Sequence, residues 1–155
     1  MTLQQVTVSP IPVISDVLNS LEISKYFSTA DCASGVWQIS VRVEDRPKTA
    51  FSTNCGHFEY KYMPFGPNGA PATFQRLMST VLSGMQGLKC LVYLDDIIVF
   101  GEILQVHNDK LRDVFARLRM HNLKLQPDKC EFLRKEITYL GHRLTTKGYS
   151  QIFIR

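Results

Sequence analysis

The feature that most constrains the fold is a pair of adjacent aspartates, Asp95 and Asp96, set between two short apolar runs. The first run is Cys90-Leu-Val-Tyr-Leu94 and the second is Ile97-Ile-Val-Phe100. β-Branched and aromatic residues in runs of this length predict strands, and the Asp-Asp step predicts the turn of a hairpin. Because the runs are apolar on both faces, the hairpin is expected to be buried except at its tip.

Two carboxylates at such a tip repel each other in surroundings of low dielectric unless a cation lies between them. The hairpin therefore indicates a divalent metal site. A solvated turn is the alternative, because aspartate is also a common turn residue. The hairpin alone does not decide between the two.

The composition is typical of one globular domain: the chain has 155 residues, of which 45% are hydrophobic and 21% charged. No apolar run approaches the ~20 residues of a membrane span, and the N-terminal residues do not resemble a secretory signal. The four cysteines lie far apart, without the spacing of a zinc site. Free thiols in an intracellular, reducing compartment are expected. No membrane partner is expected.

The net charge of +4 is distributed unevenly. Residues 1–106 hold seven Lys and Arg against nine Asp and Glu, whereas residues 107–155 hold eleven against five. A basic half of this kind fits a surface that meets a polyanion, although solvated helix faces often have the same composition.

The remaining patterns predict hairpins and two long helices. Helices are expected over 15–21, over a segment after Pro71 whose apolar stripe includes Phe74 and Met78, and over 103–121. Strands are expected over 25–31, 49–53 and 58–63, with shorter strands and turns over 123–129 and 137–142, and residues 36–43 fit either a strand or a short helix running into one. Trp37 is expected as a core or packing residue, and His107 is expected to pack in the core. The order predicts an α+β fold with an antiparallel sheet.

A third carboxylate, Asp31, also ends an apolar strand candidate, 64 positions before Asp95. If the two strands are neighbours, three carboxylates converge at one sheet edge. Such a cluster can hold two Mg²⁺ ions ~3.5–4 Å apart, which is the arrangement used for in-line phosphoryl transfer. Without other evidence, an unclustered Asp31 that caps its strand is equally acceptable.

Several motifs in order identify the chain as similar to reverse transcriptases. Tyr93-Leu-Asp-Asp96 resembles their Tyr-x-Asp-Asp box, and Phe27-Ser-Thr-Ala-Asp-Cys-Ala-Ser-Gly35 resembles their first catalytic-aspartate motif. The further motifs, in chain order, are Glu44-Asp-Arg-Pro-Lys-Thr-Ala-Phe51, Met63-Pro-Phe-Gly66, Ala70-Pro-Ala-Thr-Phe-Gln-Arg-Leu-Met78 and Tyr139-Leu-Gly-His142. The resemblance covers about residues 10–148 and points to gypsy-like LTR retrotransposons.

The resemblance implies an RNA-directed DNA polymerase palm with part of the fingers and without a thumb. It implies catalytic, metal-binding roles for Asp31, Asp95 and Asp96, with two Mg²⁺ ions, or Mn²⁺, as cofactors. The substrates implied are dNTPs on an RNA or DNA template with a primer, and the other Pol segments (fingers, thumb and RNase H) are implied partners. The implied nucleotide-binding residues are Cys32, through its carbonyl, Val36, Phe65, Gly66, Gln75 and Lys129; Lys124 is an alternative to Lys129. The implied primer grip is Tyr139, Leu140, Gly141 and His142.

The sequence departs from the family pattern at three places. Val36 stands where the family usually has an aromatic residue that blocks a ribose 2′-hydroxyl, so weaker rejection of ribonucleotides is expected. Pro67-Asn-Gly69 replaces the usual Leu-x-Asn and should re-aim the nucleotide loop. Cys32 replaces a leucine, which is a mild change if only its carbonyl is used.

The resemblance also sets the expected boundaries, with residues 1–148 as palm and partial fingers and residues 149–155 as a divergent tail. An intact element would place the protein in a cytoplasmic retroelement particle. One alternative is a catalytically inactive or repurposed fragment that keeps the palm fold and binds nucleic acid weakly. Another is a nucleotide cyclase or nuclease built on a similar palm, which would explain the metal cluster but not the motifs around it.

Overall fold

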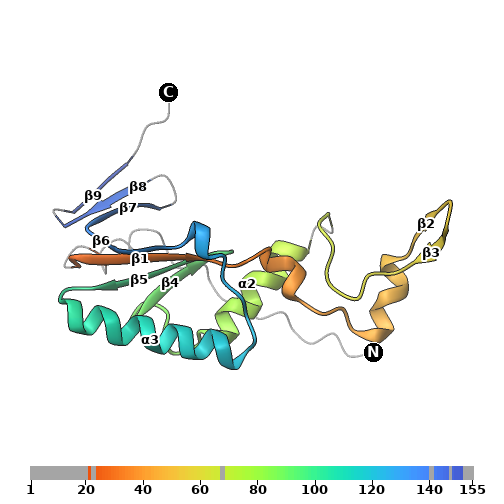
Figure 1. Ribbon diagram of the computed structural model, residues 1–155, viewed down its shortest axis with the longest axis horizontal. Coiled ribbons are helices and arrows are strands. Elements are labelled where there is room, and N and C mark those ends of the chain that lie inside the picture. The colour runs from red at the N-terminus through yellow and green to blue at the C-terminus, as the bar shows by residue number, and fades with distance from the viewer. Residues whose placement is uncertain (1–20, 22–23, 67–68, 140–141, 147, 152–155) are drawn as a thin grey trace.

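The computed structural model describes residues 21, 24–66, 69–139, 142–146 and 148–151. The predicted helix over 15–21 lies outside these residues except for Leu21, which is buried. The predicted α+β fold is confirmed: antiparallel sheets are combined with two long helices (Figure 1). None of the helices in the described part of the chain has the length and apolar character needed to cross a bilayer.

A four-stranded antiparallel sheet forms the centre of the molecule, with strand order β4-β5-β1-β6. Its strands are β1 (Tyr26–Asp31), β4 (Cys90–Tyr93), β5 (Asp96–Gly101) and β6 (Glu131–Arg134). The two apolar runs around Asp95 are thus β4 and β5, joined as the predicted hairpin, and β1 pairs with β5 along its whole length.

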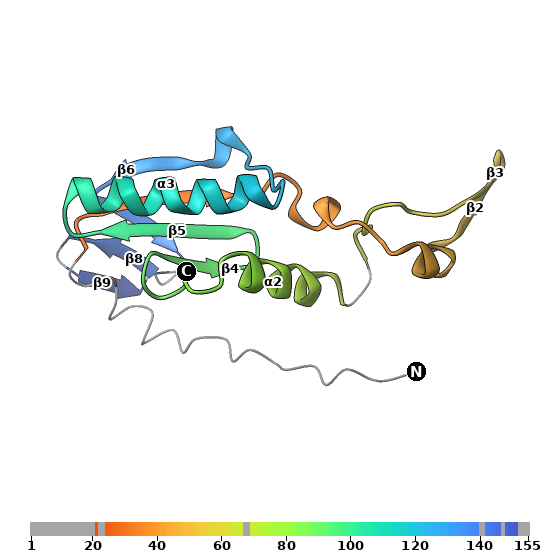
Figure 2. The same cartoon turned by 90° about the horizontal axis from the view of Figure 1, so that it is seen from below.

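Helices α2 (Ala70–Val81) and α3 (Leu104–Met120) cover one face of this sheet, and a second, three-stranded sheet lies over the other face (Figures 1 and 2). The second sheet consists of β7 (Glu136–Tyr139), β8 (His142–Thr145) and β9 (Gly148–Gln151). The predicted boundary at residue 148 stays a prediction, and β9, which begins there, pairs with β8.

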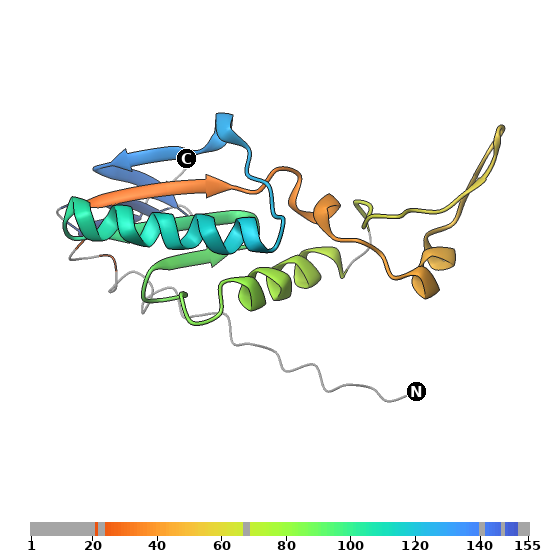
Figure 3. The ribbon, with the colours of Figure 1, turned by 60° about the horizontal axis from the view of Figure 1, so that its bottom comes forward.

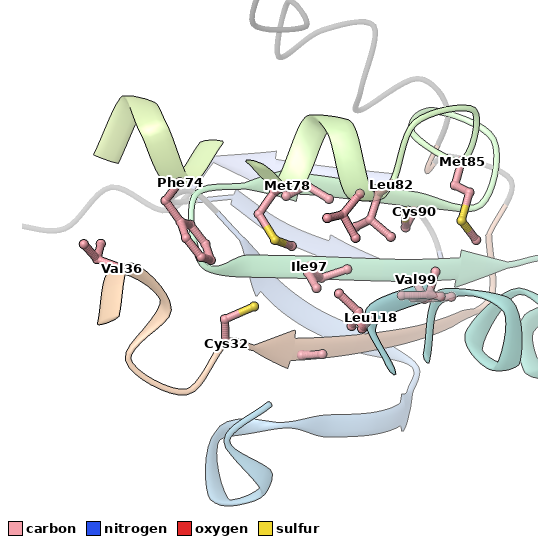
Figure 4. Close-up of a cluster of buried hydrophobic side chains, with 14 of the residues drawn as sticks. Cys32, Val36, Phe74, Met78, Leu82, Met85, Cys90, Ile97, Val99 and Leu118 are labelled. Atoms are coloured by element: carbon pink, nitrogen blue, oxygen red, sulfur yellow. The ribbon is translucent and has the colours of Figure 1, made fainter. Parts of the chain in front are cut away.

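Each face of the central sheet has its own apolar core. On the helix face, Phe74, Met78 and Leu82 point toward Ile97 of β5 (Figure 4). On the other face, the core consists of Leu21, Phe27, Leu91, Ile98, Phe100, Ile137, Tyr139 and Leu144. Burial on both faces explains why β4 and β5 are continuously apolar rather than alternating.

Residues 43–62 form an arm that extends away from the central sheet (Figures 1 and 3). The arm contains the 3₁₀ helix η2 (Val43–Thr49) and the hairpin of β2 (Phe51–Thr53) and β3 (Gly56–Phe58). The predicted strand 49–53 is therefore correct but too long, whereas the predicted strand 58–63 is misplaced and shares only Phe58 with β3. The segment before the arm is not a strand but the 3₁₀ helix η1 (Gly35–Gln38).

Trp37, expected as a core or packing residue, lies outside the core, because its side chain is 53% exposed, but it packs against Phe65. The prediction for His107 is confirmed. His107 is fully buried, and its Nε2 lies 3.1 Å from Ser28 Oγ.

Candidate active site

The register of the central sheet brings the predicted aspartates together. Asp31 ends β1 and Asp96 begins β5, and the two are paired directly across the strands. Directly opposed residues of an antiparallel pair point to the same face of the sheet. Asp95 occupies the turn next to Asp96. The condition that the sequence left open, that these two strands are neighbours, is thus met.

The electrostatics of the cluster follow from this crowding. Partial burial, with repulsion from Asp31 and Asp96, raises the pKa of Asp95 above its ordinary value. Partial burial and repulsion from Asp31 also raise the pKa of Asp96. The Lys129 ammonium acts in the opposite direction on both groups. Carboxylates held in this way gain from a nearby cation.

The cation that the structure supplies is Lys129, at the end of the 3₁₀ helix η3 (Pro127–Lys129). Its Nζ lies 3.7 Å from Asp31 Oδ2 and its side chain is 58% exposed. The backbone holds this segment beside β1, because the Gln126 N–H donates to the Asp31 carbonyl at 2.9 Å. Of the two lysines that the sequence offered, the structure places Lys129 at the aspartates.

The donor set suits a hard divalent cation, since carboxylate oxygens are the ligands that Mg²⁺ and Mn²⁺ prefer. Burial and mutual repulsion raise the pKa values of Asp95 and Asp96, and a bound cation would offset both effects. Within the described ranges, however, no group of three or more His, Cys, Asp or Glu side chains is arranged so that it could hold a metal ion. The oxygen donors thus suit the ion chemically, but their arrangement does not form a site, and Asp31 is paired with the Lys129 ammonium.

Cys32 follows Asp31 and is fully enclosed, with 1% of its surface exposed. Burial, helped by the charges of Asp95 and Asp31, raises the pKa of its thiol to about 12. The thiol therefore stays protonated at neutral pH and is a poor metal ligand. Its N–H donates to the Asp95 carbonyl at 3.1 Å. The replacement of leucine by cysteine thus leaves the backbone as the relevant part of this residue.

Three of the residues predicted for nucleotide binding are Val36, which is buried beside the aspartates, and Phe65 and Gly66, which belong to the loop before α2. Val36 lies on η1 beside the aspartates and is 8% exposed, packed in the helix-face core with Phe74. Phe65 is 65% exposed and stacks against Trp37, with ring centroids 4.9 Å apart. Gly66 has φ +114°, a conformation that favours glycine. Phe65 thus lies against Trp37 of η1.

The predicted primer grip is divided between the two sides of the β7–β8 turn. Tyr139 and His142 pair across the hairpin, and Leu140 and Gly141 lie outside the described residues. Tyr139 is 6% exposed, and burial together with the charge of Asp96 raises the pKa of its phenol. Tyr139 therefore lies close to the aspartate cluster, on the face opposite the helices.

Two further residues hold the site together: Gln38, which the sequence did not point to, and Gly35, which ends the first catalytic-aspartate motif but was given no role. The Gln38 amide donates to the carbonyls of Ala33 and Lys124, at 2.8 and 2.9 Å, and accepts from the Lys124 N–H at 2.7 Å. It thereby joins the segment after β1 to the segment before η3. Gly35 has no room for a side chain, because a Cβ there would meet Asp95 Oδ1 and stand 2.7 Å from Phe74 Cζ. The contact between Gln38 and Lys124 and that between Gly35 and Asp95 each join residues far apart in sequence, so a local sequence motif does not reveal them.

Comparison with known proteins agrees with this geometry. The family model described as reverse transcriptase (RNA-dependent DNA polymerase) matches residues 2–144. The chain is 50% identical over 139 residues to the retrovirus-related Pol polyprotein from transposon 297 of Drosophila melanogaster, covering 90% of this chain and 13% of that protein. It is 36% identical, again over 90% of this chain and 13% of the relative, to the Pol polyprotein from transposon gypsy of the same species.

Among solved structures, the chain resembles a foamy viral protease-reverse transcriptase in complex with an RNA/DNA hybrid. The TM-score is 0.78 and the identity 28%, covering 89% of this chain and 18% of that one. A second structure of the foamy viral enzyme, in complex with double-stranded DNA, gives the same TM-score over 87% of this chain. This chain spans 13% of the length of the Drosophila relatives.

Proposed function

The chain belongs to the reverse transcriptase family, a family of RNA-directed DNA polymerases and hence nucleotidyltransferases, and from this premise we propose that it carries the catalytic palm of a retrotransposon Pol. The reaction is the attack of a primer 3′-hydroxyl on the α-phosphate of a dNTP, with release of pyrophosphate. The observation that carries the proposal is the pairing of Asp31 with Asp96 across β1 and β5, with Asp95 in the adjoining turn.

Asp31, Asp95 and Asp96 are the residues that would hold two Mg²⁺ or Mn²⁺ ions, and the Cys32 carbonyl is an additional oxygen donor. When bound, such ions polarise the phosphate and favour ionisation of the attacking hydroxyl. Asp31 and Asp95 would be the principal ligands of such ions, whereas Asp96 would support the site from the first position of β5.

Lys129 has a second role in this proposal. Its ammonium pairs with Asp31 at 3.7 Å in the metal-free chain, and its 58% exposed side chain is free to turn toward a triphosphate. There it would offset the negative charge that develops on the pyrophosphate leaving group. Loss of the ion pair costs little, because exposed pairs of this kind contribute about 0–1 kcal/mol.

The substrate contacts extend outward from the aspartates. Val36, Phe65 and Gly66 are assigned to the nucleotide, and Tyr139 to His142 to the primer end. Template and primer as partners are supported by the foamy viral structures, which are complexes with an RNA/DNA hybrid and with double-stranded DNA. The remaining Pol segments are proposed partners, with residues 149–155 as a divergent tail. Four free cysteines fit an intracellular, reducing location, such as a cytoplasmic retroelement particle.

A catalytically inactive palm with weak nucleic-acid binding is the second candidate function. The arrangement of the donors favours it, because within the described residues no three His, Cys, Asp or Glu side chains are placed so that they could hold a metal ion. The two candidates differ in whether the aspartates rearrange to bind a divalent ion. Activity is therefore decided by metal binding at the aspartates.

The test is primer extension by the purified chain with Mg²⁺ or Mn²⁺, on RNA and DNA templates, beside the double variant Asp95→Asn/Asp96→Asn. Extension is expected in the unmodified chain and should fall on the order of a thousandfold in the variant, since its metal ligands are lost. Asp109→Asn/Asp113→Asn is a matched control, because it removes two exposed carboxylates from α3. Equal extension by both variants would refute the proposal, and absence of extension and of Mn²⁺ binding in the unmodified chain would favour the inactive palm.

A further inference from the structure

The turn that carries Asp95 has a backbone conformation that needs outside support. Two residues, Leu94 and Asp95, connect β4 to β5. Leu94 has φ +51°, in the left-handed region that residues with a side chain seldom adopt. A conformation of this kind persists only where the surroundings hold it, and such positions cluster at functional sites. The question is which contacts hold the Leu94–Asp95 turn.

One contact comes from α2. Gln75 Oε1 accepts a hydrogen bond from the Leu94 N–H at 2.7 Å, across 19 residues of sequence. The helix that carries Gln75 is fixed in place, because the neighbouring Phe74 and Met78 are completely buried against β5 (Figure 4). Gln75 therefore anchors the tip of the β4–β5 hairpin to a helix that is held in place by the core.

A second set of contacts holds the other side of the turn. The Asp95 carbonyl accepts from the Cys32 N–H at 3.1 Å. The Asp95 side chain lies against Gly35, where a Cβ would meet its Oδ1. The turn is thus bound on one side by the end of β1 and η1, and on the other side by Gln75. Without the Gln75 hydrogen bond, the Leu94 N–H would lose its side-chain acceptor, and the left-handed conformation of Leu94 would lose its support from α2.

We propose that Gln75 is a positioning residue of the active site, which fixes the Leu94–Asp95 turn and thereby the place of the Asp95 carboxylate. The inference rests on the proposed function, and it differs from the nucleotide contact that the family resemblance implied for Gln75. The acceptor oxygen of Gln75 is occupied by the Leu94 N–H at 2.7 Å. Its effect on the reaction therefore passes through the turn rather than through the nucleotide.

The test compares the unmodified chain with Gln75→Met, which keeps the length of the side chain and removes the acceptor. Hydrogen exchange of the Leu94 amide, measured by NMR, should become about tenfold faster or more, because the amide loses its partner. Mn²⁺ binding, measured by electron paramagnetic resonance, should weaken by about tenfold, the effect of one hydrogen bond. In primer extension, the apparent metal requirement should rise while the KM for dNTP at saturating metal changes less than twofold.

Two controls separate positioning from general damage. Gln75→Glu retains an acceptor oxygen at the same reach and should restore the slow exchange of the Leu94 amide. Gln105→Met makes the same substitution on α3, where the amide contacts only the exposed Asp109, and should leave exchange and Mn²⁺ binding unchanged.

The proposal is overturned if Gln75→Met leaves both Leu94 exchange and Mn²⁺ affinity within twofold of the unmodified chain. A raised KM for dNTP with unchanged exchange would also overturn it, in favour of a direct nucleotide contact. If the unmodified chain binds no Mn²⁺, the proposed metal site fails, yet the exchange of the Leu94 amide still decides whether Gln75 holds the turn.

Discussion

Two of the hairpins, β4–β5 in the central sheet and β2–β3 in the arm, are held in different ways. The β4–β5 hairpin lies between two apolar cores, and its tip is fixed by Gln75 and Cys32, which come from distant parts of the chain. The β2–β3 hairpin of the arm has no buried residue. Its aromatic rings meet only one another, with Phe51 centroids 5.8 Å from Phe58 and 5.1 Å from Tyr60.

The arm is held by hydrogen bonds rather than by a core. At its base, the Val41 N–H donates to the Lys61 carbonyl at 2.9 Å. Thr49 Oγ1 donates to the Arg46 carbonyl at 2.7 Å and accepts from the Tyr60 N–H at 2.9 Å. Regions with few buried apolar contacts open at low free energy, whereas core strands open only with the whole fold. The aspartates are therefore positioned by the global fold, and local opening of the arm is expected to leave their positions unchanged.

The largest expected effect tests the core side of this comparison. Phe74→Ala removes a fully buried ring between α2 and β5. The free energy of unfolding should fall by about 3–5 kcal/mol, the usual cost of emptying such a position. Urea unfolding followed by circular dichroism measures it. A loss below about 1 kcal/mol would show that the helix-face core does not hold the hairpin.

Gly35→Ala tests the packing around Asp95 itself. The added Cβ would meet Asp95 Oδ1 and would stand 2.7 Å from Phe74 Cζ, so the aspartate or the ring must move. Overpacking of this kind costs about 1–3 kcal/mol. Mn²⁺ affinity should fall in the same variant, because a carboxylate is displaced.

The control for Gly35→Ala is a glycine with room for a side chain. Gly84 is unsuitable because it has φ +76°, whereas Gly69 has open space around it and an ordinary φ. Gly69→Ala should therefore leave both quantities unchanged.

Substitution of Val36 tests whether the part of the molecule around the aspartates also determines the preference for deoxyribonucleotides over ribonucleotides. The Val36 side chain is smaller than the aromatic residue that the family resemblance leads one to expect, and it stands beside Gly35 on η1. If the chain extends primers, it should accept ribonucleotides, and Val36→Phe should lower the ribonucleotide rate by about tenfold relative to dNTP, as expected for a modest steric contact. Parallel extension with each nucleotide type measures the ratio. Strong dNTP preference in the unmodified chain would contradict the role assigned to Val36.

Asp95→Asn tests the electrostatic cost of the cluster in the metal-free chain. The pKa of Asp95 is raised in the folded state, so the folded chain binds more protons than the unfolded chain between the ordinary and the raised value. The free energy of unfolding therefore falls as the pH rises through this window, and the penalty persists above it. At pH 7 with EDTA, Asp95→Asn should be more stable by about 0.5–1 kcal/mol, and at pH 3 the two chains should be equal. Urea unfolding at both pH values checks this; Asp113→Asn, which loses an ion pair to Lys89, should show no gain.

Burial also explains which elements could be predicted from the sequence. The helix expected over 103–121 is α3 at Leu104–Met120, and the strand expected over 25–31 is β1 at Tyr26–Asp31. Both have an apolar pattern because they face a core. The strand β6, Glu131–Arg134, was not predicted, since all four of its residues are exposed and follow no such pattern. In the arm, the first strand was predicted too long and the second was placed too far along the chain, because the exposed aromatic residues Phe58, Tyr60 and Tyr62 have high strand propensity without the burial that fixes a strand.

The same limit applies to the site. Asp31, Asp95 and Asp96 could be found because each follows or begins an apolar strand, where a carboxylate is conspicuous. Gly35 stands in the first catalytic-aspartate motif, but its role and that of Gln38 could not be predicted, since they depend on contacts with Asp95 and Lys124 that only the folded chain creates. The placement of Lys129 rather than Lys124 at Asp31 was likewise left open by the sequence, because it depends on the path of η3.

The smallest expected effect tests the arm. Phe58→Ala removes a ring that is 48% exposed and contacts only Phe51. The free energy of unfolding should change by less than about 0.5 kcal/mol, as for most surface substitutions. Hydrogen exchange of the amides in β2 and β3 should nevertheless become faster, because the local cluster that keeps the hairpin closed is weakened, while exchange in β4 and β5 stays the same. If Phe58→Ala accelerated exchange in β4 and β5, or cost more than about 1 kcal/mol, the arm and the active site would form one cooperative unit.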